Sequence, residues 1–174
     1  MSDHDHEPVD ADAGIRACCL TISSSRAAGE GGPDESGPAL ERFADSLGAS
    51  VVGSEVLDDD EELIARRLRY WSDQGGCELI LTSGGTGMAP SDVTPEATRA
   101  AIEREAPGIA EAMREASKPH TAHWMLSRAV AGIRGSTLII NFPGSPKSIA
   151  ETGDALAPAL PHALRLLTGR ATRH

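Results

Sequence analysis

The stretch Leu79–Thr98, which reads LILTSGGTGMAPSDVTPEAT, constrains the fold more than any other part of the chain. It opens with apolar and β-branched residues that suit a buried strand. Three glycines follow within Ser83–Gly87, and Thr94-Pro95-Glu96 then provides a helix start. A strand, a glycine-rich turn and a helix in this order form the building unit of parallel α/β sheets.

The glycine-rich turn also has a chemical interpretation. Glycine adopts conformations that other residues avoid, so the backbone N–H groups of such a turn can close around an anion. The turn lacks the Gly-Lys-Ser/Thr of a P-loop and the spacing of the Rossmann fingerprint. A tight turn without a ligand is the alternative, but the neighbouring segment DVTPE favours a phosphate-binding role.

Length and charge narrow the class of protein. The chain has 174 residues, of which 40% are hydrophobic, so we expect one α/β domain over residues 14–174. The net charge of −10 argues against nucleic acid or an anionic membrane as a partner, because both need a basic face. No apolar run is long enough to span a bilayer and the N-terminus does not resemble a signal peptide, so we expect a cytoplasmic protein.

Two other segments predict little chemistry. Residues 1–13 carry five acidic side chains and are predicted to be a disordered tail. His4 and His6 in this tail are interpreted as incidental, because no further metal ligand is fixed nearby. Cys18, Cys19 and Cys77 lack metal-ligand spacing and are interpreted as reduced thiols in or near the core.

Apolar periodicity predicts the order of the elements. The predicted strands cover residues 15–23, 50–57, 78–82 and 137–141. The predicted helices begin at Ser36 as N-cap, at Asp58–Asp60, at Thr94 with an interruption at Pro107, and at Pro158, while 26–37 and 143–148 are expected to be loops. This order predicts a three-layer fold with a doubly wound, mostly parallel sheet and helices on both faces.

In such a sheet, ligands bind at the carboxyl ends of the strands. The chain segments expected at those ends are Ser23–Ser25, Leu57–Asp60, Thr82–Gly87 and Asn141–Gly144. We therefore expect these four segments to form one site at one edge of the sheet.

Acidic residues are the first candidates within this site. Asp92 follows the glycine turn, and since Thr94 and Pro95 already start the helix, a capping role does not explain it. Held beside an anion-binding turn, Asp92 could orient Mg²⁺ on a triphosphate. Asp58–Asp60 are more acids than one helix cap needs, so one of them is expected to face the site.

Cationic candidates are fewer. Lys147 follows the PG-containing turn Pro143–Ser145 and opens a helix, where a phosphate contact is favoured over a solvated lysine. Arg128 and Arg134 are the other candidates, with a surface salt bridge as the alternative for each. His120 and His123 have no partners at ligand spacing and are interpreted as surface or packing residues.

Several segments, taken together, resemble a known family. These are LILTSGGTGMAPSDVTPEAT, IEREAPGIAEAMREAS, MLSRAVAGIRGSTLIINFPGSPKS and LAPALPHALRLL. In this order they are similar to the MogA/MoaB molybdopterin adenylyltransferases, which include the G domains of gephyrin and of plant homologues. The resemblance covers about residues 14–169 and implies the molybdenum cofactor biosynthesis fold.

The resemblance also implies a reaction. The terminal phosphate of molybdopterin would attack the α-phosphorus of ATP in the presence of Mg²⁺, and pyrophosphate would leave. It further implies a homotrimer and a downstream MoeA-like metal-insertion protein as partner. Molybdenum and tungsten pathways, trimer and hexamer, and MogA-type and MoaB-type roles all stay open.

Site residues follow from the resemblance by position. Asp59 and Asp92 match the family's catalytic aspartates and would hold Mg²⁺, with Asp58 as a register alternative to Asp59. The residues implied in binding nucleotide and pterin are Ser23, Ser36, Gly37, Ser83, Gly84, Gly85, Thr86, Gly87, Pro143, Gly144, Ser145 and Lys147.

The chain departs from the family pattern at three positions. Ser91 replaces the usual Arg before the DVTPE aspartate, which removes a cation. Ser24 stands where many members have Asp, and Asp58 stands where the family has Pro. Two alternative functions remain: a non-catalytic molybdopterin-binding or scaffold module, and a CinA-like nucleotide hydrolase with the same fold.

Overall fold

A computed structural model describes residues 14–170, so the predicted tail with His4 and His6 lies outside the described residues. The strands are β1 (Arg16–Ile22), β2 (Ser50–Leu57), β3 (Leu79–Ser83), β4 (Arg104–Glu105), β5 (Ala131–Arg134) and β6 (Thr137–Phe142). The helices are α1 (Ser24–Ala27), α2 (Ser36–Ser46), α3 (Glu61–Asp73), α4 (Thr94–Ala101), α5 (Pro107–Ser117), α6 (Pro146–Leu156) and α7 (Leu160–Thr168), with a 3-10 turn at Trp124–Leu126.

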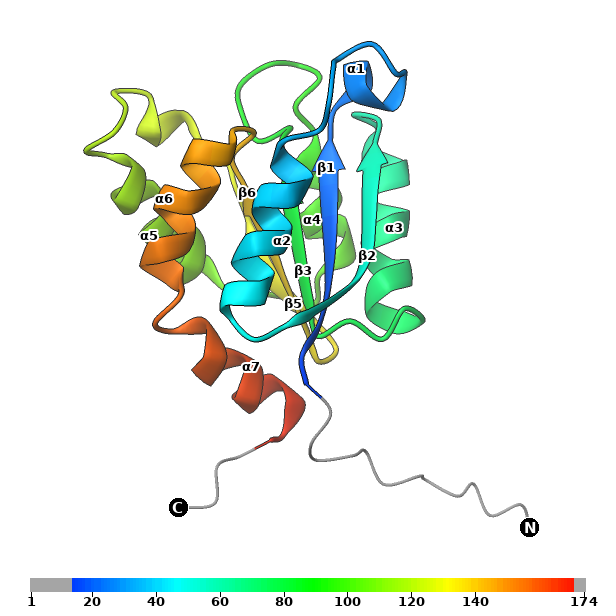
Figure 1. Ribbon diagram of the computed structural model, residues 1–174, viewed down its shortest axis with the longest axis vertical. Coiled ribbons are helices and arrows are strands. Elements are labelled where there is room, and N and C mark those ends of the chain that lie inside the picture. Colours follow the sequence, from blue (N-terminus) through cyan, green and yellow to red (C-terminus); the bar gives the residue numbers. More distant parts are fainter. Residues whose placement is uncertain (1–13, 171–174) are drawn as a thin grey trace.

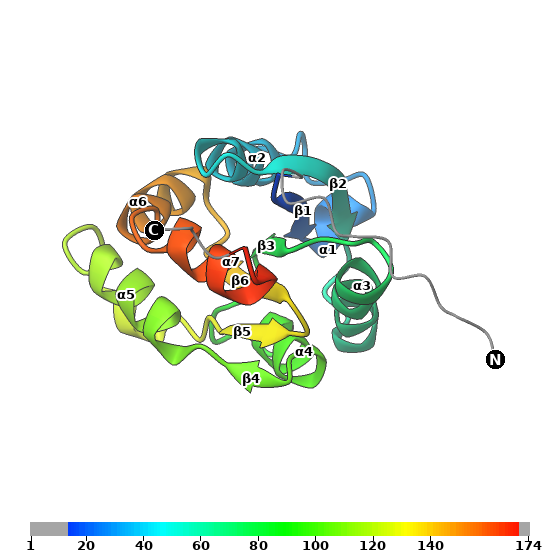
Figure 2. The same cartoon turned by 90° about the horizontal axis from the view of Figure 1, so that it is seen from below.

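The six strands form one sheet in the order β2-β1-β3-β6-β5-β4. The pairs β2/β1, β1/β3 and β3/β6 are parallel, whereas β5 and β4 are antiparallel to their neighbours. Helices α2, α5 and α6 cover one face of the sheet and α3 and α4 cover the other (Figures 1 and 2). The predicted three-layer, mostly parallel α/β fold is confirmed.

Each face of the sheet has its own core. Successive strand side chains point to opposite faces, so Leu81 and Ile140 pack with α2 and α6, while Ile80 and Ile139 pack with α3 and α4. Both faces are buried, which explains why the central strands read as continuous apolar runs. Cys18, Cys19 and Cys77 are buried free thiols, as predicted.

The parallel strands end level with one another. Ile22 pairs with Leu57, Thr21 pairs with Ser83, and Ser83 pairs with Phe142. The loops that follow therefore leave the sheet at one edge, which is the upper edge in Figure 1. The connection after β1 runs toward β2, and the connection after β3 runs toward β6, so the two leave in opposite directions along the sheet. In parallel α/β sheets, the crevice that binds ligands forms between two strands whose connections diverge in this way.

Several local predictions were wrong. Ser36 is the first residue of α2 and not its cap, because the Asp34 carboxylate accepts hydrogen bonds from the backbone N–H groups of Ser36 and Gly37. Pro107 does not interrupt a helix; it starts α5, since its missing N–H costs nothing in a first turn.

Other element boundaries also differ. The segment predicted as a loop at 143–148 already begins α6 at Pro146, with Ser145 as N-cap. The short helix α1 and the antiparallel strands β4 and β5 were not predicted, since two to four residues carry too little periodicity. The last helix begins at Leu160 and not at Pro158.

A buried amide links the sheet to α4 near the upper edge. Asn141 Nδ2 donates to Thr82 Oγ1 at 3.1 Å and to Thr98 Oγ1 at 2.9 Å, and Asn141 Oδ1 accepts from the Val130 N–H at 3.1 Å. Asn141, Thr82 and Thr98 are completely buried. These bonds connect β3, β6, α4 and the chain entering β5.

Asn141→Leu should lower the free energy of unfolding by about 2–4 kcal/mol, because it leaves a buried N–H and two hydroxyls without partners. Thr98→Val removes one of these bonds and should cost only about 1 kcal/mol. Urea denaturation of both variants measures the difference. Equal losses would contradict the network.

Burial also raises the pKa of the Cys77 thiol to about 11, against 9.0 for the free group. Between these two pH values the unfolded chain holds fewer protons than the folded one, so the free energy of unfolding should fall as pH rises from about 9 to about 11. Burial also raises the pKa of the Cys18 and Cys19 thiols, so Cys77→Ala should make this part of the stability curve less steep without flattening it. Urea denaturation across that range measures the slope. A curve identical to wild type would contradict the assignment.

Candidate active site

The glycine turn after β3 has a backbone that only glycine accepts readily. Gly84 and Gly85 have φ values of 101° and 66°, in the left-handed region that other residues rarely enter. A methyl group on Gly84 would overlap the Ile22 carbonyl oxygen, and one on Gly85 would overlap Thr94 Oγ1. The turn therefore lies directly against the end of β1 and the start of α4.

Hydrogen bonds anchor the start of this turn. Ser83 Oγ donates to the Pro143 carbonyl at 2.8 Å, and Thr94 Oγ1 donates to the Gly84 carbonyl at 2.9 Å. The Gly84 N–H donates to the Phe142 carbonyl at 3.3 Å, and the Thr94 N–H donates to the Gly85 carbonyl at 3.1 Å. The turn is thus fixed to β6 and α4.

The next four backbone N–H groups are free. Within the described residues, no acceptor lies within hydrogen-bond range of the N–H groups of Gly85, Thr86, Gly87 and Met88. Backbone donors are normally paired, and a run of unpaired donors in a glycine turn forms a concave site for an anion. The geometry is compatible with the predicted phosphate-binding role, which stays a prediction.

Two carboxylates border the same turn. Asp59 Oδ1 lies 3.2 Å from the position of a methyl group on Gly85, and Asp92 Oδ2 lies 2.8 Å from that of one on Gly87. Asp59 comes from the end of β2 and Asp92 from the chain before α4. Asp60 is the cap of α3, since its Oδ1 accepts from the Leu63 N–H at 2.7 Å. Of the three adjacent acids, Asp59 is thus the one that borders the turn.

Ser24 holds Asp59 in place. Asp59 Oδ2 accepts from both the backbone N–H and the hydroxyl of Ser24 at 2.9 Å, and the Asp59 N–H donates back to Ser24 Oγ at 3.1 Å. Ser24 Oγ is also hydrogen-bonded to Asp58 Oδ1. Two departures from the family pattern, Ser24 and Asp58, are therefore in direct contact.

Asp92 is hydrogen-bonded to Ala89, in the segment that follows the glycine turn. Its Oδ2 accepts from the Ala89 N–H at 3.0 Å, and its N–H donates to the Ala89 carbonyl at 2.9 Å. Helix α4 has Val93 as N-cap with no side-chain bond, so Asp92 does not cap it. Asp92 Oδ1 and Asp59 Oδ1 have no hydrogen-bond donor among the described residues, which leaves one oxygen of each carboxylate for a ligand.

The remaining predicted binding residues lie around this edge with different roles. Ser36 Oγ donates to the Gly144 carbonyl at 3.1 Å and so fixes α2 to the loop after β6. Ser23 and Ser145 cap α1 and α6. Lys147 is 84% exposed, with its Nζ 3.7 Å from Glu151 Oε1 in the same helix, so its contact with phosphate stays a prediction.

The candidate arginines take separate roles. Arg134 pairs with Asp73, which lowers the pKa of that carboxyl, and donates to the Ala101 carbonyl, so the salt-bridge alternative is correct for it. Arg128 binds the glycine turn itself. His120 Nδ1 lies 3.3 Å from Glu151 Oε1 on the surface, as interpreted from the sequence.

Sequence reasoning missed two roles. Asp34 accepts from the α2 N-terminus and from Thr21 Oγ1 at 2.8 Å; its place two residues before Ser36 was a usable capping signal. The pairing of Arg128 with Glu96 spans 32 residues, and no local pattern predicts such a contact.

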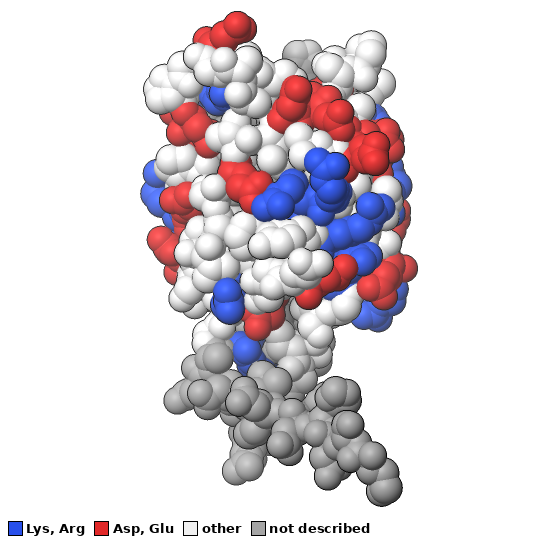
Figure 3. Space-filling model, turned by 90° about the vertical axis from the view of Figure 1, so that its right-hand side faces the viewer, with Lys and Arg blue, Asp and Glu red and all other residues white. Residues whose placement is uncertain are grey.

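The surroundings of the site are acidic. Figure 3 shows acidic side chains along the upper part of the face on which α3 lies, with Lys and Arg below them. Asp58, Asp59, Asp60, Glu61 and Glu62 are consecutive there. A polyphosphate arriving at this edge meets like charge, so its binding needs backbone donors and a cation.

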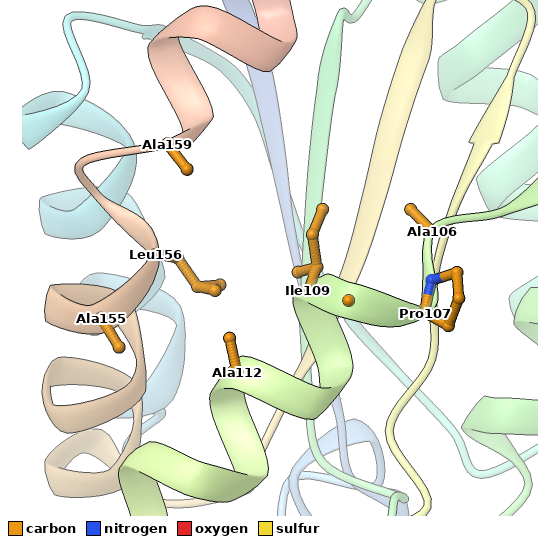
Figure 4. Close-up of a pocket in the computed structure, with 8 residues that line it drawn as sticks. Ala106, Pro107, Ile109, Ala112, Ala155, Leu156 and Ala159 are labelled. Carbon is orange, nitrogen blue, oxygen red and sulfur yellow. The ribbon is translucent and has the colours of Figure 1, made fainter.

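An apolar hollow lies away from this edge, between the first turn of α5 and the chain that joins α6 to α7 (Figure 4). Its lining is Ala106, Pro107, Gly108, Ile109, Ala112, Ala155, Leu156 and Ala159. None of these side chains is charged or can donate a hydrogen bond, so the hollow differs from the polar edge that carries the glycine turn.

Among residues 14–170, every helix is too short or too polar to span a lipid bilayer.

The chain thus has a mostly parallel α/β sheet, with a turn of free backbone N–H groups and two carboxylates at the edge where ligands bind in such sheets. The chain belongs to the family described as "Probable molybdopterin binding domain", which matches residues 18–162.

Individual relatives agree with the family. The chain is 38% identical to the molybdopterin adenylyltransferase of Escherichia coli K12 over 164 residues, covering 86% of this chain and 84% of the relative. It is 41% identical to the Drosophila melanogaster molybdenum cofactor synthesis protein cinnamon, covering 77% of this chain. The structure of the molybdopterin biosynthesis enzyme MoaB from Thermus thermophilus superposes with a TM-score of 0.83 at 46% identity, covering 89% of this chain and 97% of that one.

The length of match differs among relatives. The chain spans only 22% of cinnamon and 65% of the Helicobacter pylori J99 molybdopterin adenylyltransferase. The Thermoplasma acidophilum protein CinA matches with a TM-score of 0.63 at 17% identity, which shows a shared fold alone.

Gly85→Ala should weaken anion binding, because the new methyl group strains a backbone at φ 66° and displaces Thr94 Oγ1. Calorimetric titration with pyrophosphate should give a dissociation constant at least about tenfold higher, equivalent to about 1.4 kcal/mol. Gly29→Ala is the control: Gly29 has a similar φ of 78° but open space around it. It should cost about 1–2 kcal/mol of stability and leave binding unchanged. A similar effect of both variants on binding would count against the site.

Proposed function

We propose that this protein is a molybdopterin adenylyltransferase that acts in molybdenum cofactor biosynthesis. An oxygen of the terminal phosphate of molybdopterin attacks the α-phosphorus of ATP. The bond from that phosphorus to the β-phosphate oxygen breaks, and pyrophosphate leaves with adenylylated molybdopterin as the other product. Relatives named molybdopterin adenylyltransferase support this reaction. The free N–H groups of the glycine turn support it as well, because they can bind phosphate oxygens.

One observation carries the proposal: four consecutive free N–H groups at Gly85–Met88, bordered by Asp59 and Asp92. Transfer of a phosphoryl-type group needs positioning and charge neutralisation more than covalent help from the protein. The attacking phosphate is already mostly ionised near neutral pH, so the site needs no general base. The absence of a catalytic dyad from the turn is therefore consistent with the chemistry.

The residues fit Mg²⁺. Mg²⁺ is usually held by one or two carboxylates together with substrate phosphates, and Asp59 Oδ1 and Asp92 Oδ1 are the oxygens that remain free for it. The described residues contain no cluster of three or more ligating side chains, so phosphate oxygens would have to complete its coordination. When bound, Mg²⁺ would neutralise charge that develops on the phosphates.

The other residues have supporting roles in this proposal. The free N–H groups of the glycine turn bind phosphate oxygens, and Ser24 keeps the Asp59 carboxylate turned toward the turn. Ser91, where the family has Arg, leaves the backbone donors and the metal to balance the phosphate charge. Lys147 at the start of α6 supplies a further cation.

Asp59→Asn and Asp92→Asn should each lower the rate of AMP transfer at least about 100-fold, since each removes a charged ligand for Mg²⁺. The assay combines the protein with molybdopterin, ATP and Mg²⁺ and follows the adenylylated product. Asp58→Asn is the matched control, expected to act within about threefold of wild type. Full activity of Asp92→Asn would refute the assignment of Asp92 as a catalytic residue. Loss of activity in Asp58→Asn but not in Asp59→Asn would assign that role to Asp58 in place of Asp59.

The same assay separates the alternatives. A non-catalytic binding or scaffold module would bind molybdopterin without consuming ATP. A CinA-like hydrolase would instead cleave ADP-ribose. Neither outcome is expected here.

We also propose a cytoplasmic homotrimer that passes its product to a MoeA-like metal-insertion protein; this rests on the family resemblance. Sedimentation equilibrium should give three times the chain mass of 18.2 kDa. A monomer or a hexamer would contradict the trimer.

A further inference from the structure

Arg128 makes an unusual set of contacts with the glycine turn. Its backbone N–H donates to the Thr86 carbonyl at 2.9 Å, its Nε donates to the Gly87 carbonyl at 2.7 Å, and its Nη2 donates to the Asp92 carbonyl at 2.6 Å. One residue thus binds three carbonyls at both ends of the segment 86–92, from 36 to 42 positions away along the chain.

These contacts fix the direction of the free donors. In a trans peptide the carbonyl and the following N–H point in opposite directions. Because the carbonyls of Thr86 and Gly87 point at Arg128, the N–H groups of Gly87 and Met88 point away from it. These two donors belong to the unpaired run that forms the anion site.

Glu96 holds the guanidinium in this position. Arg128 Nη1 is hydrogen-bonded to Glu96 Oε1, and Arg128 lowers the pKa of the Glu96 carboxyl. Glu96 lies in the first turn of α4, so the pair connects the turn to that helix. All three guanidinium nitrogens of Arg128 already have partners in the protein, so the group is not a free cation for phosphate.

We propose that Arg128, held by Glu96, is a positioning residue that orients the N–H groups of Gly87 and Met88 toward a bound phosphate. It acts on the ligand only through the backbone. The catalytic part of this inference rests on the proposed function, whereas the binding part needs only an anion.

Arg128→Lys provides the sharpest test, because it keeps the charge but loses the planar fork that reaches two carbonyls and a carboxylate. Pyrophosphate is the binding probe, titrated by calorimetry, and nitrogen-15 relaxation reports the backbone order of Gly87 and Met88. We expect the dissociation constant to rise at least about tenfold and the order parameter of Met88 to fall from about 0.85 toward 0.6. Gly87 should change less, because the backbone N–H of residue 128 still binds the Thr86 carbonyl in this variant. Glu96→Gln should change both quantities in the same direction by a smaller amount. This variant takes the place of Arg128→Lys in the test if the lysine variant does not fold.

Arg134→Lys is the matched control. Arg134 likewise pairs with an acid and donates to a carbonyl, but its partners Asp73 and Ala101 are outside the turn. It should leave pyrophosphate binding and the order of the turn within about twofold of wild type, even where thermal stability falls.

The outcomes separate this inference from the proposed function. If Arg128→Lys binds pyrophosphate as wild type does, or if wild type does not bind it, the inference is overturned. If binding depends on Arg128 while wild type transfers no AMP to molybdopterin, the inference stands and the proposed function fails. For an active enzyme, a raised KM for ATP that exceeds the change in kcat is expected, and the reverse split would overturn the positioning role.

Discussion

The pairing of four parallel strands is the constraint on which the rest of this structure depends. Backbone hydrogen bonds set Ile22 level with Leu57, and set Ser83 level with both Thr21 and Phe142. Four loops that are far apart in the sequence therefore leave the sheet at one edge. A slip of one residue in β2 would turn its side chains to the opposite face and move Asp59 away from the turn.

The net negative charge of the protein explains why backbone N–H groups, and not a basic surface, face the ligand at the carboxyl ends of the strands. The protein is acidic overall and has consecutive acids beside the turn, so it cannot attract phosphate with a basic surface. It instead presents backbone N–H groups, which carry no net charge and are held by Arg128, Thr94 and Ser83. Carboxylates next to an anion site are unfavourable unless a cation lies between them and the phosphate, which supports the proposed role of Asp59 and Asp92 as metal ligands.

The departures from the family pattern acquire meaning from their contacts. Ser24 lacks the acid that many members have, yet its hydroxyl bonds Asp58, an acid where the family has proline. Ser91, where the family has arginine, is exposed.

The sequence by itself determined the α/β class, the parallel strands, the glycine turn and the acids beside it, because periodicity and glycine chemistry are local. It could not determine the antiparallel strands β4 and β5, or which of three adjacent aspartates borders the turn. Those depend on hydrogen bonds that form only after the sheet has assembled. The contact of Arg128 with the turn is the clearest case: only tertiary structure decided that this arginine binds the carbonyls of the turn, because its partners lie 32 to 42 residues away.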